Sequence, residues 1–380
     1  MGDRLDSIDT LRAIAMFFVV VAHTHPFQNV GTHGNHVFFV LDTIGQFDVP
    51  FFFLTAGYFL TGTLDAGDVI TSLWGFVRRL GSLYLFGVLS YLAVLVATTA
   101  GVALIAGRSV RSAFVASLPD GLSPISLLYY GDSIVGPLWF LTALLFSIAF
   151  LSAFVALEKT RYLLPVAATA HVLGLLTQNY PAVLDLPFPT RDALFFGFFY
   201  VALGFRLGSI DWTPKRTRSR LYLGAVGVLS MLQLLEQYAI GYVLRDGTLA
   251  QGVYTTQYAV STVFLVLALV AYALSNPKLG SETSLPAVGR HAVGIYLLHI
   301  PVYRIFEALN RVSQVLIGID FKTTVLWQVV MTPLVYVLSL AIYRLTAMVG
   351  LVETGGNHGP WLDRLRARFT SNSDSTPTTD

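Results

Sequence analysis

The stretch Leu80–Ala106 reads LGSLYLFGVLSYLAVLVATTAGVALIA and contains no Asp, Glu, Lys or Arg. A helix that crosses the hydrocarbon core of a bilayer needs about 20 consecutive apolar residues, and this run exceeds that length. Within hydrocarbon the backbone must satisfy its own hydrogen bonds, which a helix does. The stretch therefore predicts a membrane-spanning helix.

The composition of the whole chain agrees with a membrane protein. Of its 380 residues 54% are hydrophobic and 12% are charged, and the mean hydropathy is +0.65. A soluble domain carries roughly 25% charged residues, so this chain has too few charges to cover a water-facing surface of its size. The composition predicts an all-α polytopic membrane protein of the cell membrane.

Apolar runs recur from end to end, and we count ten of them. Residues 1–350 are therefore expected to form one membrane domain with about ten transmembrane helices, and residues 351–380 a polar cytoplasmic tail. The expected helices are Leu11–Phe27, Thr43–Leu64, Leu80–Ala106, Pro137–Leu157, Tyr162–Thr177, Ala193–Ile210, Leu221–Ile240, Tyr254–Leu274, Ala292–Leu309 and Thr324–Met348.

The distribution of positive charge predicts the orientation of the chain. With ten helices, the two termini and the even-numbered connections share one face, and this face carries most of the 24 Lys and Arg residues. Loops rich in Lys and Arg stay in the cytoplasm, so both termini are expected there. The connections Gln28–Asp42 and Gly107–Gly136 are then external.

Several function classes are excluded by residue content. The chain has no cysteine, so it forms no disulfide, no thiolate nucleophile and no acyl-thioester of its own. The net charge of +2 comes from scattered residues, which leaves no footprint for nucleic acid. Four histidines near the external face leave a metal or haem site open as an alternative, but their spacing is loose and no metal is predicted. They are His23, His25, His33 and His36.

The first predicted helix carries ionisable residues that are costly inside a bilayer and are by default candidates for function. Asp9 and Arg12 are three residues apart, so they can pair on one helix face. Arg12 and His23 are eleven apart, which returns to within about 20° of the same face and separates them by roughly 16 Å along the axis. The alternative is that Arg12 extends to the interface and His23 caps the helix end.

Two further polar residues lie in predicted helices. Asp48 lies near the external end of the second apolar run, on the same side of the membrane as His23, and could orient that imidazole as a carboxylate does for a general base. Its alternative role is a first-turn carboxylate that the helix dipole favours. His299 lies deep in the ninth run, where a structural hydrogen-bonding role is favoured.

These residues fall into motifs that resemble the integral-membrane acyltransferase type 3 family. The family opens with leucine-aspartate-x-leucine-arginine followed by ten residues and a histidine, which Ile8–Arg12 and His23 match. Other matches occur in the family's order over about residues 5–347. They are Asp48–Tyr58, which departs at Ala56 and Tyr58 from the serine and phenylalanine of many members, the pair Arg78 and Arg79 before the third helix, Pro137–Leu141 and Ile295–His299.

The resemblance implies an acyltransferase that transfers groups other than aminoacyl groups. It would move an acyl group, most often acetyl, from cytoplasmic acyl-CoA to a hydroxyl of a carbohydrate, glycolipid or other acceptor, as in O-acetylation of polysaccharides. Acyl-CoA is a co-substrate, and no bound cofactor is implied. The resemblance makes His23 and Arg12 the essential pair, with His23 as the general base and Arg12 holding acyl-CoA. Asp48 is added as an expected catalytic residue because of its position on the same side of the membrane as His23.

The resemblance also implies roles for the other motif residues. Arg78 and Arg79 would contact the CoA phosphates, since arginine forks suit phosphate, although setting topology is an equal alternative. Asp9, Trp139, Tyr296 and His299 are structural or possible site residues. The main rival function is a multi-helix transporter or exporter without acyl transfer, which ten helices fit by count alone.

Overall fold

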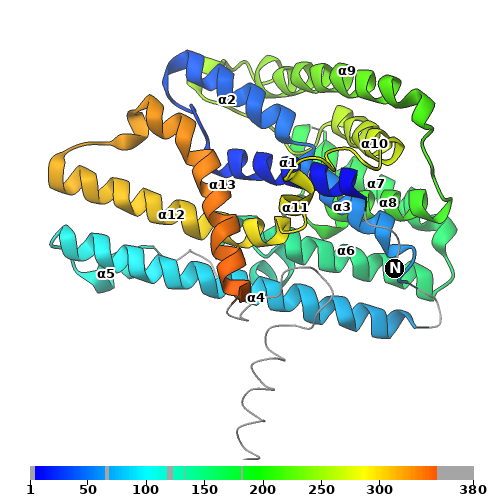
Figure 1. Ribbon diagram of the computed structural model, residues 1–380, viewed down its shortest axis with the longest axis horizontal. Helices are drawn as coiled ribbons and strands as arrows, with labels where there is room; N and C mark the ends of the chain where they lie inside the picture. The colour runs from blue at the N-terminus through cyan, green and yellow to red at the C-terminus, as the bar shows by residue number, and fades with distance from the viewer. Residues whose placement is uncertain (1–4, 65–67, 118–122, 133, 181–182, 349–380) are drawn as a thin grey trace, which may run out of the picture.

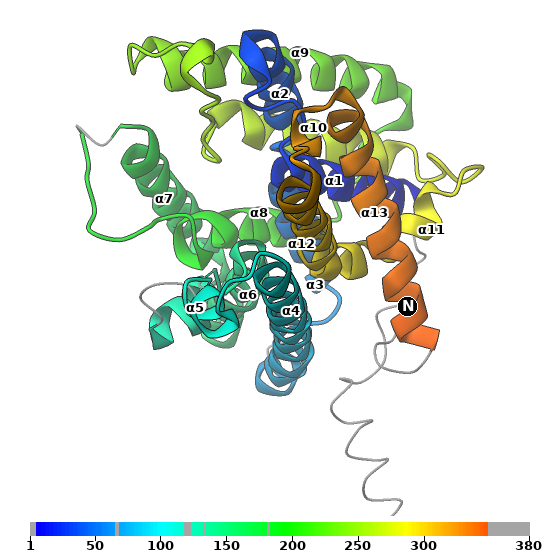
Figure 2. The same ribbon diagram turned by 90° about the vertical axis from the view of Figure 1, so that its left-hand side faces the viewer.

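A computed structural model describes residues 5–64, 68–117, 123–132, 134–180 and 183–348, and every regular element within them is helical. The helices pack as a bundle with α1 in its interior, and α13 crosses the direction of α4 and α12 (Figures 1 and 2). The α-helices are α1 (Asp6–Thr24), α2 (Gly31–Gly45), α3 (Asp48–Leu60), α4 (Val69–Ile105), α5 (Val110–Val115), α6 (Trp139–Ala156), α7 (Thr160–Asn179), α8 (Phe198–Ser209), α9 (Ser219–Tyr238), α10 (Val260–Ser275), α11 (Leu285–Gly289), α12 (Ala292–Ile317) and α13 (Val325–Met348). The predicted tail lies outside the described residues.

The helices confirm a polytopic membrane protein. Among the described residues, seven helical stretches are long and apolar enough to cross a membrane, and two shorter apolar stretches, Ala193–Ser209 and Val260–Ser275, accompany them. Each of the ten predicted runs overlaps a helix, but α7, with Arg161, Pro165 and His171, is less apolar than the seven. The seven are Asp6–Thr24, Gly31–Leu60, Val69–Ile105, Gly136–Ala156, Arg216–Val243, Ala292–Ile317 and Val325–Met348.

The expected connection Gln28–Asp42 is wrong, because most of it belongs to α2. This helix buries Phe38 and Phe39. Asn35 fixes the turn before it, since its side-chain oxygen accepts a hydrogen bond from the Asn29 N–H (2.8 Å) and its amide donates to the Leu249 carbonyl (2.7 Å). Asn35, one of the polar residues that interrupt the apolar pattern, thus contacts a distant loop.

The third predicted helix begins earlier than Leu80. α4 starts at Val69, so Arg78 and Arg79 lie within the helix and not before it. Its 37 residues give a length of about 55 Å, against a hydrocarbon core of about 30 Å. Arg78 and Arg79 thus do not end this helix, and the predicted apolar run covers only its later part.

Glycines let α1 and its neighbours approach closely. A Cβ at Gly289 of α11 would lie 1.7 Å from the Asp9 carbonyl oxygen of α1. Between α3 and α8, a Cβ at Gly57 would lie 2.1 Å from the Val201 carbonyl oxygen, and one at Gly204 2.0 Å from that of Leu54. Small residues of this kind allow backbone contact between membrane helices. The close packing holds α1 at the centre of the bundle.

Candidate active site

The predicted pair of Asp9 and Arg12 is confirmed. The Arg12 Nη1 atom lies 2.9 Å from the Asp9 Oδ1 atom, and the two side chains are 32% and 6% exposed. The guanidinium also lies 5.7 Å from the centre of the Phe59 ring. Asp9 therefore holds one nitrogen of the Arg12 guanidinium, and the rest of this partly exposed group can contact a ligand.

His23, near the other end of α1, stacks on His299 of α12. The ring centres are 5.2 Å apart and the planes differ by 20°. The Nδ1–H of His299 donates to the Tyr296 carbonyl at 2.6 Å, which fixes the orientation of that ring. Within the described chain His23 has no side-chain hydrogen bond, so its nitrogens remain open to a substrate. The oriented His299 ring thus lies stacked against the His23 ring.

The motifs Pro137–Leu141 and Ile295–His299, which the structure places at α6 and α12, meet beside this stack. The Tyr296 hydroxyl donates to the Pro137 carbonyl, at the turn that leads into α6. Trp139, the first residue of α6, is buried and lies under the Arg191 guanidinium, 5.0 Å from its ring centre. Segments far apart in the sequence are thereby brought to one place.

Arg191 is a site residue that the sequence analysis did not single out. Its charge lies within electrostatic range of the His23 ring. The neighbouring Asp192 accepts hydrogen bonds from the Phe195 N–H and the Tyr129 hydroxyl, both at 2.9 Å. Burial raises the pKa of Asp192 to about 6, while these bonds act in the opposite direction. The sequence feature that could have identified Arg191 is the charged pair Arg191 and Asp192 directly before the apolar run that begins at Ala193.

A cavity of about 680 Å³ lies at this end of α1, and His23 forms part of its wall. The other walls come from the residues after α1, from α12 and from the segment that leads into α13. Polar side chains and aromatic rings both line the cavity. Lining residues include His25, Tyr91, Tyr303, Arg304, Glu307 and Trp327.

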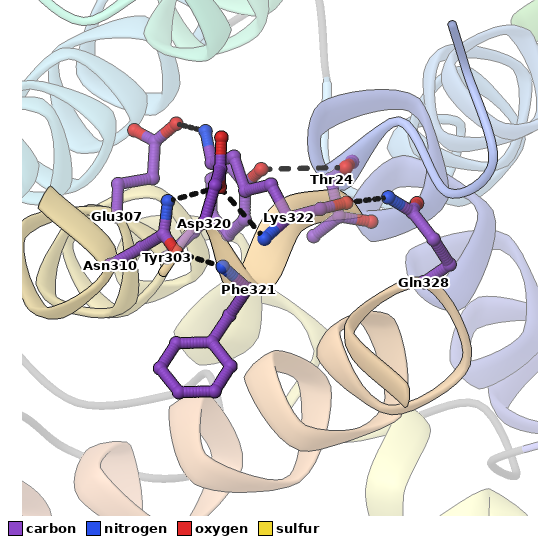
Figure 3. Close-up of polar contacts among 8 residues, drawn as sticks. All are labelled: Thr24, Tyr303, Glu307, Asn310, Asp320, Phe321, Lys322 and Gln328. Carbon is purple, nitrogen blue, oxygen red and sulfur yellow. Dashed lines mark hydrogen bonds and ion pairs between the residues drawn. The ribbon is translucent and has the colours of Figure 1, made fainter. Parts of the chain in front are cut away.

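A network of side chains fixes the wall between α12 and α13 (Figure 3). Asn310 donates to the Asp320 carboxylate (2.9 Å) and accepts from the Phe321 N–H (2.7 Å). Gln328 accepts from the Phe27 N–H at 2.6 Å, which ties the chain after α1 to α13. The Asn310 bond is also the main cause that lowers the pKa of Asp320. The cavity therefore has a rigid outer rim.

Asp48, His33 and His36 form no contact with the His23 ring within the described chain. The Asp48 carboxylate accepts from the Val49 N–H (2.5 Å) in the first turn of α3. No hydrogen bond or ion pair joins it to His23 in the described chain, and the ring partner of His23 is His299. His33 and His36 are exposed on α2, and the described residues contain no group of three metal-ligating side chains.

Arg78 and Arg79 are exposed near the start of α4. Tyr343 of α13 lies within electrostatic range of Arg79. The arginine pair lies near the N-terminal end of α4. Tyr91 lies further along the same helix and lines the cavity. The arginine pair and the cavity thus occupy different depths of the bundle.

Fold and site together define an integral membrane protein whose polar residues gather around one histidine beside a cavity. The chain belongs to the acyltransferase type 3 family, since the family model described as an acyltransferase domain matches residues 5–344. The resemblance of the motifs is thereby confirmed.

Curated proteins similar to this chain are named as racemases. An amino-acid racemase of Enterococcus faecalis is 33% identical over 94 residues, which are 24% of this chain and 13% of that protein. A serine/alanine racemase of Enterococcus gallinarum is 28% identical over 244 residues, 61% of this chain and 34% of that protein. The chain thus spans about a third or less of these relatives. No solved structure gives a significant match.

Proposed function

We propose that this protein moves an acyl group, in the first place acetyl, from cytoplasmic acyl-CoA to a hydroxyl of a carbohydrate or glycolipid acceptor. One observation carries the proposal: His23, whose ring has no hydrogen-bonding partner in the described chain, forms part of a polar cavity wall. Membership of the acyltransferase family supports the reaction class. The activity in the relatives' names belongs to much longer proteins and is not part of this proposal.

The reaction follows from the chemistry of His23. A neutral imidazole takes the proton of the acceptor hydroxyl as its oxygen attacks the thioester carbonyl carbon. The new C–O bond forms, the C–S bond breaks, and the CoA sulfur leaves and receives the proton. The products are an ester and free CoA. Since the chain has no cysteine, no acyl-thioester of the protein takes part.

Arg12 would bind acyl-CoA from the other end of α1. Arg12 and His23 are eleven residues apart on one helix, which corresponds to roughly 16 Å. An extended ligand is needed to connect them, and the pantetheine arm of CoA has this character. The cation would hold the donor while the carbonyl carbon reaches His23.

This proposal requires the start of α4 to face the cytoplasm and the cavity to face outward. The natural chain has no cysteine, so a single introduced cysteine reports its own side of the membrane. Thr217→Cys, in the exposed connection before α9, should resist an impermeant thiol reagent applied to intact cells, and Ser112→Cys, exposed on α5, should react. The reverse pattern would overturn the orientation.

Arg78 and Arg79 are proposed to contact the CoA phosphates. Such contacts are formed equally in the ground and transition states, so the double variant Arg78→Gln, Arg79→Gln should raise the KM for acyl-CoA about tenfold with little change in kcat. Arg220→Gln, an exposed change of the same kind at the start of α9, is the control. An unchanged KM in correctly oriented protein would leave the pair with a topological role alone.

Transfer can be separated from the rival transport function with labelled donor. Purified protein supplied with acetyl-CoA labelled in the acetyl group and with acceptor-containing membranes should release CoA and form alkali-labile ester in equal amounts. An exporter would move the acceptor across a bilayer without ester formation. Movement without ester would replace the proposal by the transporter function.

A further inference from the structure

The cavity beside His23 contains a cation without an anionic partner. Arg304 of α12 lines it, and within the described residues this guanidinium forms no ion pair. Its Nε atom is buried and has no hydrogen-bond acceptor. The contact that holds it is with the Tyr91 ring, 5.6 Å from the guanidinium carbon to the ring centre. A buried donor of this kind is costly unless a ligand accepts from it.

The carboxylate nearest in sequence does not neutralise Arg304. Glu307, one turn further along α12, pairs with Lys322 at 2.5 Å between Oε1 and Nζ. Lys322 follows Asp320, which Asn310 holds in place, so this ion pair is part of the rigid rim (Figure 3). Glu307 and Lys322 compensate each other, and the lining keeps one net positive charge from Arg304.

His25 of the wall does not add to this positive charge at neutral pH. His25 lies just beyond α1, and burial lowers its pKa, although Asp42 and Glu307 act in the opposite direction. A neutral His25 adds no positive charge. The uncompensated charge in the cavity therefore belongs to Arg304.

We propose that the acceptor carries an anionic group, a carboxylate or a phosphate, which Arg304 binds while the acceptor hydroxyl lies at His23. His23 and Arg304 line the same cavity, so one molecule bound there can contact both of them. The inference rests on the proposed acyl transfer and names the chemical class of its acceptor.

Matched pairs of small probes test the inference by binding. The carboxylate pair is methyl glucuronide and methyl glucoside, and the phosphate pair is glycerol 3-phosphate and glycerol. For the purified full-length protein, ligand-induced rise in melting temperature is titrated to give an affinity for each probe. At least one acidic probe should bind about tenfold or more tightly than its neutral partner, since bonds to charged groups are the stronger ones.

Three variants make the result specific to Arg304. Arg304→Gln should remove the preference for the acidic probe, and Arg304→Lys should retain part of it and also serve if the Gln variant does not fold. Arg311→Gln, an exposed change on the same helix, should retain all of it. Equal binding of both members of each pair, or a preference that survives in Arg304→Gln, would overturn the inference.

The outcomes separate this inference from the proposed function. If acidic probes bind through Arg304 but no labelled ester forms, the anion site stands and acyl transfer fails. If ester forms but neutral and acidic acceptors bind alike, acyl transfer stands and the anion site fails. A preference in one pair alone identifies the group as carboxylate or phosphate.

Discussion

His23→Ala is expected to lower acyl transfer per folded molecule by about 10²- to 10⁴-fold while acyl-CoA binding persists. A general base acts on the transition state and contributes little to ground-state affinity. The measurement is the initial rate of ester formation from acetyl-CoA, normalised to folded protein. Donor binding is titrated on the same preparation.

His33→Ala is the matched control for His23→Ala. His33 is exposed on α2 and lies outside the cavity lining, so its loss should leave both rate and binding unchanged. If His23 only caps α1, its variant loses folded protein while the remainder keeps its specific activity. Near-normal activity per folded His23→Ala molecule would refute the general-base role.

The second large effect is expected at Arg12. Arg12→Gln should weaken acyl-CoA binding by about tenfold or more and lower transfer with it, because a forked cation is lost from the donor site. The same change leaves the carboxylate of Asp9 buried without its partner, which is destabilising in itself. Donor affinity is measured by titration and folded yield by thermal denaturation.

Two companion variants separate binding from stability. The double variant Asp9→Asn, Arg12→Gln removes both charges, so the orphaned carboxylate no longer contributes to instability. Asp9→Asn alone keeps the cation and should retain most of the donor affinity. A double variant that folds and binds acyl-CoA normally would assign the ion pair a structural role.

Local sequence patterns predicted the helices and a contact within one helix. Apolar runs predicted the helices, and the three-residue spacing predicted the contact of Asp9 with Arg12. The predicted helix bounds were wrong where polar or charged residues lie within a helix. α2 interrupts its apolar pattern with Asn35, whose partner is Leu249, and α4 begins at Val69, before the charged pair Arg78 and Arg79.

Much of the candidate site depends on contacts between distant segments. The stack of His23 on His299 and the hydrogen bond from Tyr296 to Pro137 join helices that no spacing rule connects. Arg304 could have been noticed, since with Tyr303 and Glu307 it forms a polar stripe at helical spacing in a predicted span. Its lack of an anionic partner, however, depends on the loop that carries Lys322.

The account is tested most directly by transfer across a sealed membrane. Inverted vesicles, with their cytoplasmic face outward, are prepared from host cells that express the wild-type or the His23→Ala protein. Labelled acetyl-CoA is then added outside. The account predicts alkali-labile labelled ester in the vesicle-enclosed acceptor fraction with the wild type, and at least about a hundredfold less with His23→Ala. Equal labelling with the two proteins, or no ester with the wild type, would contradict it.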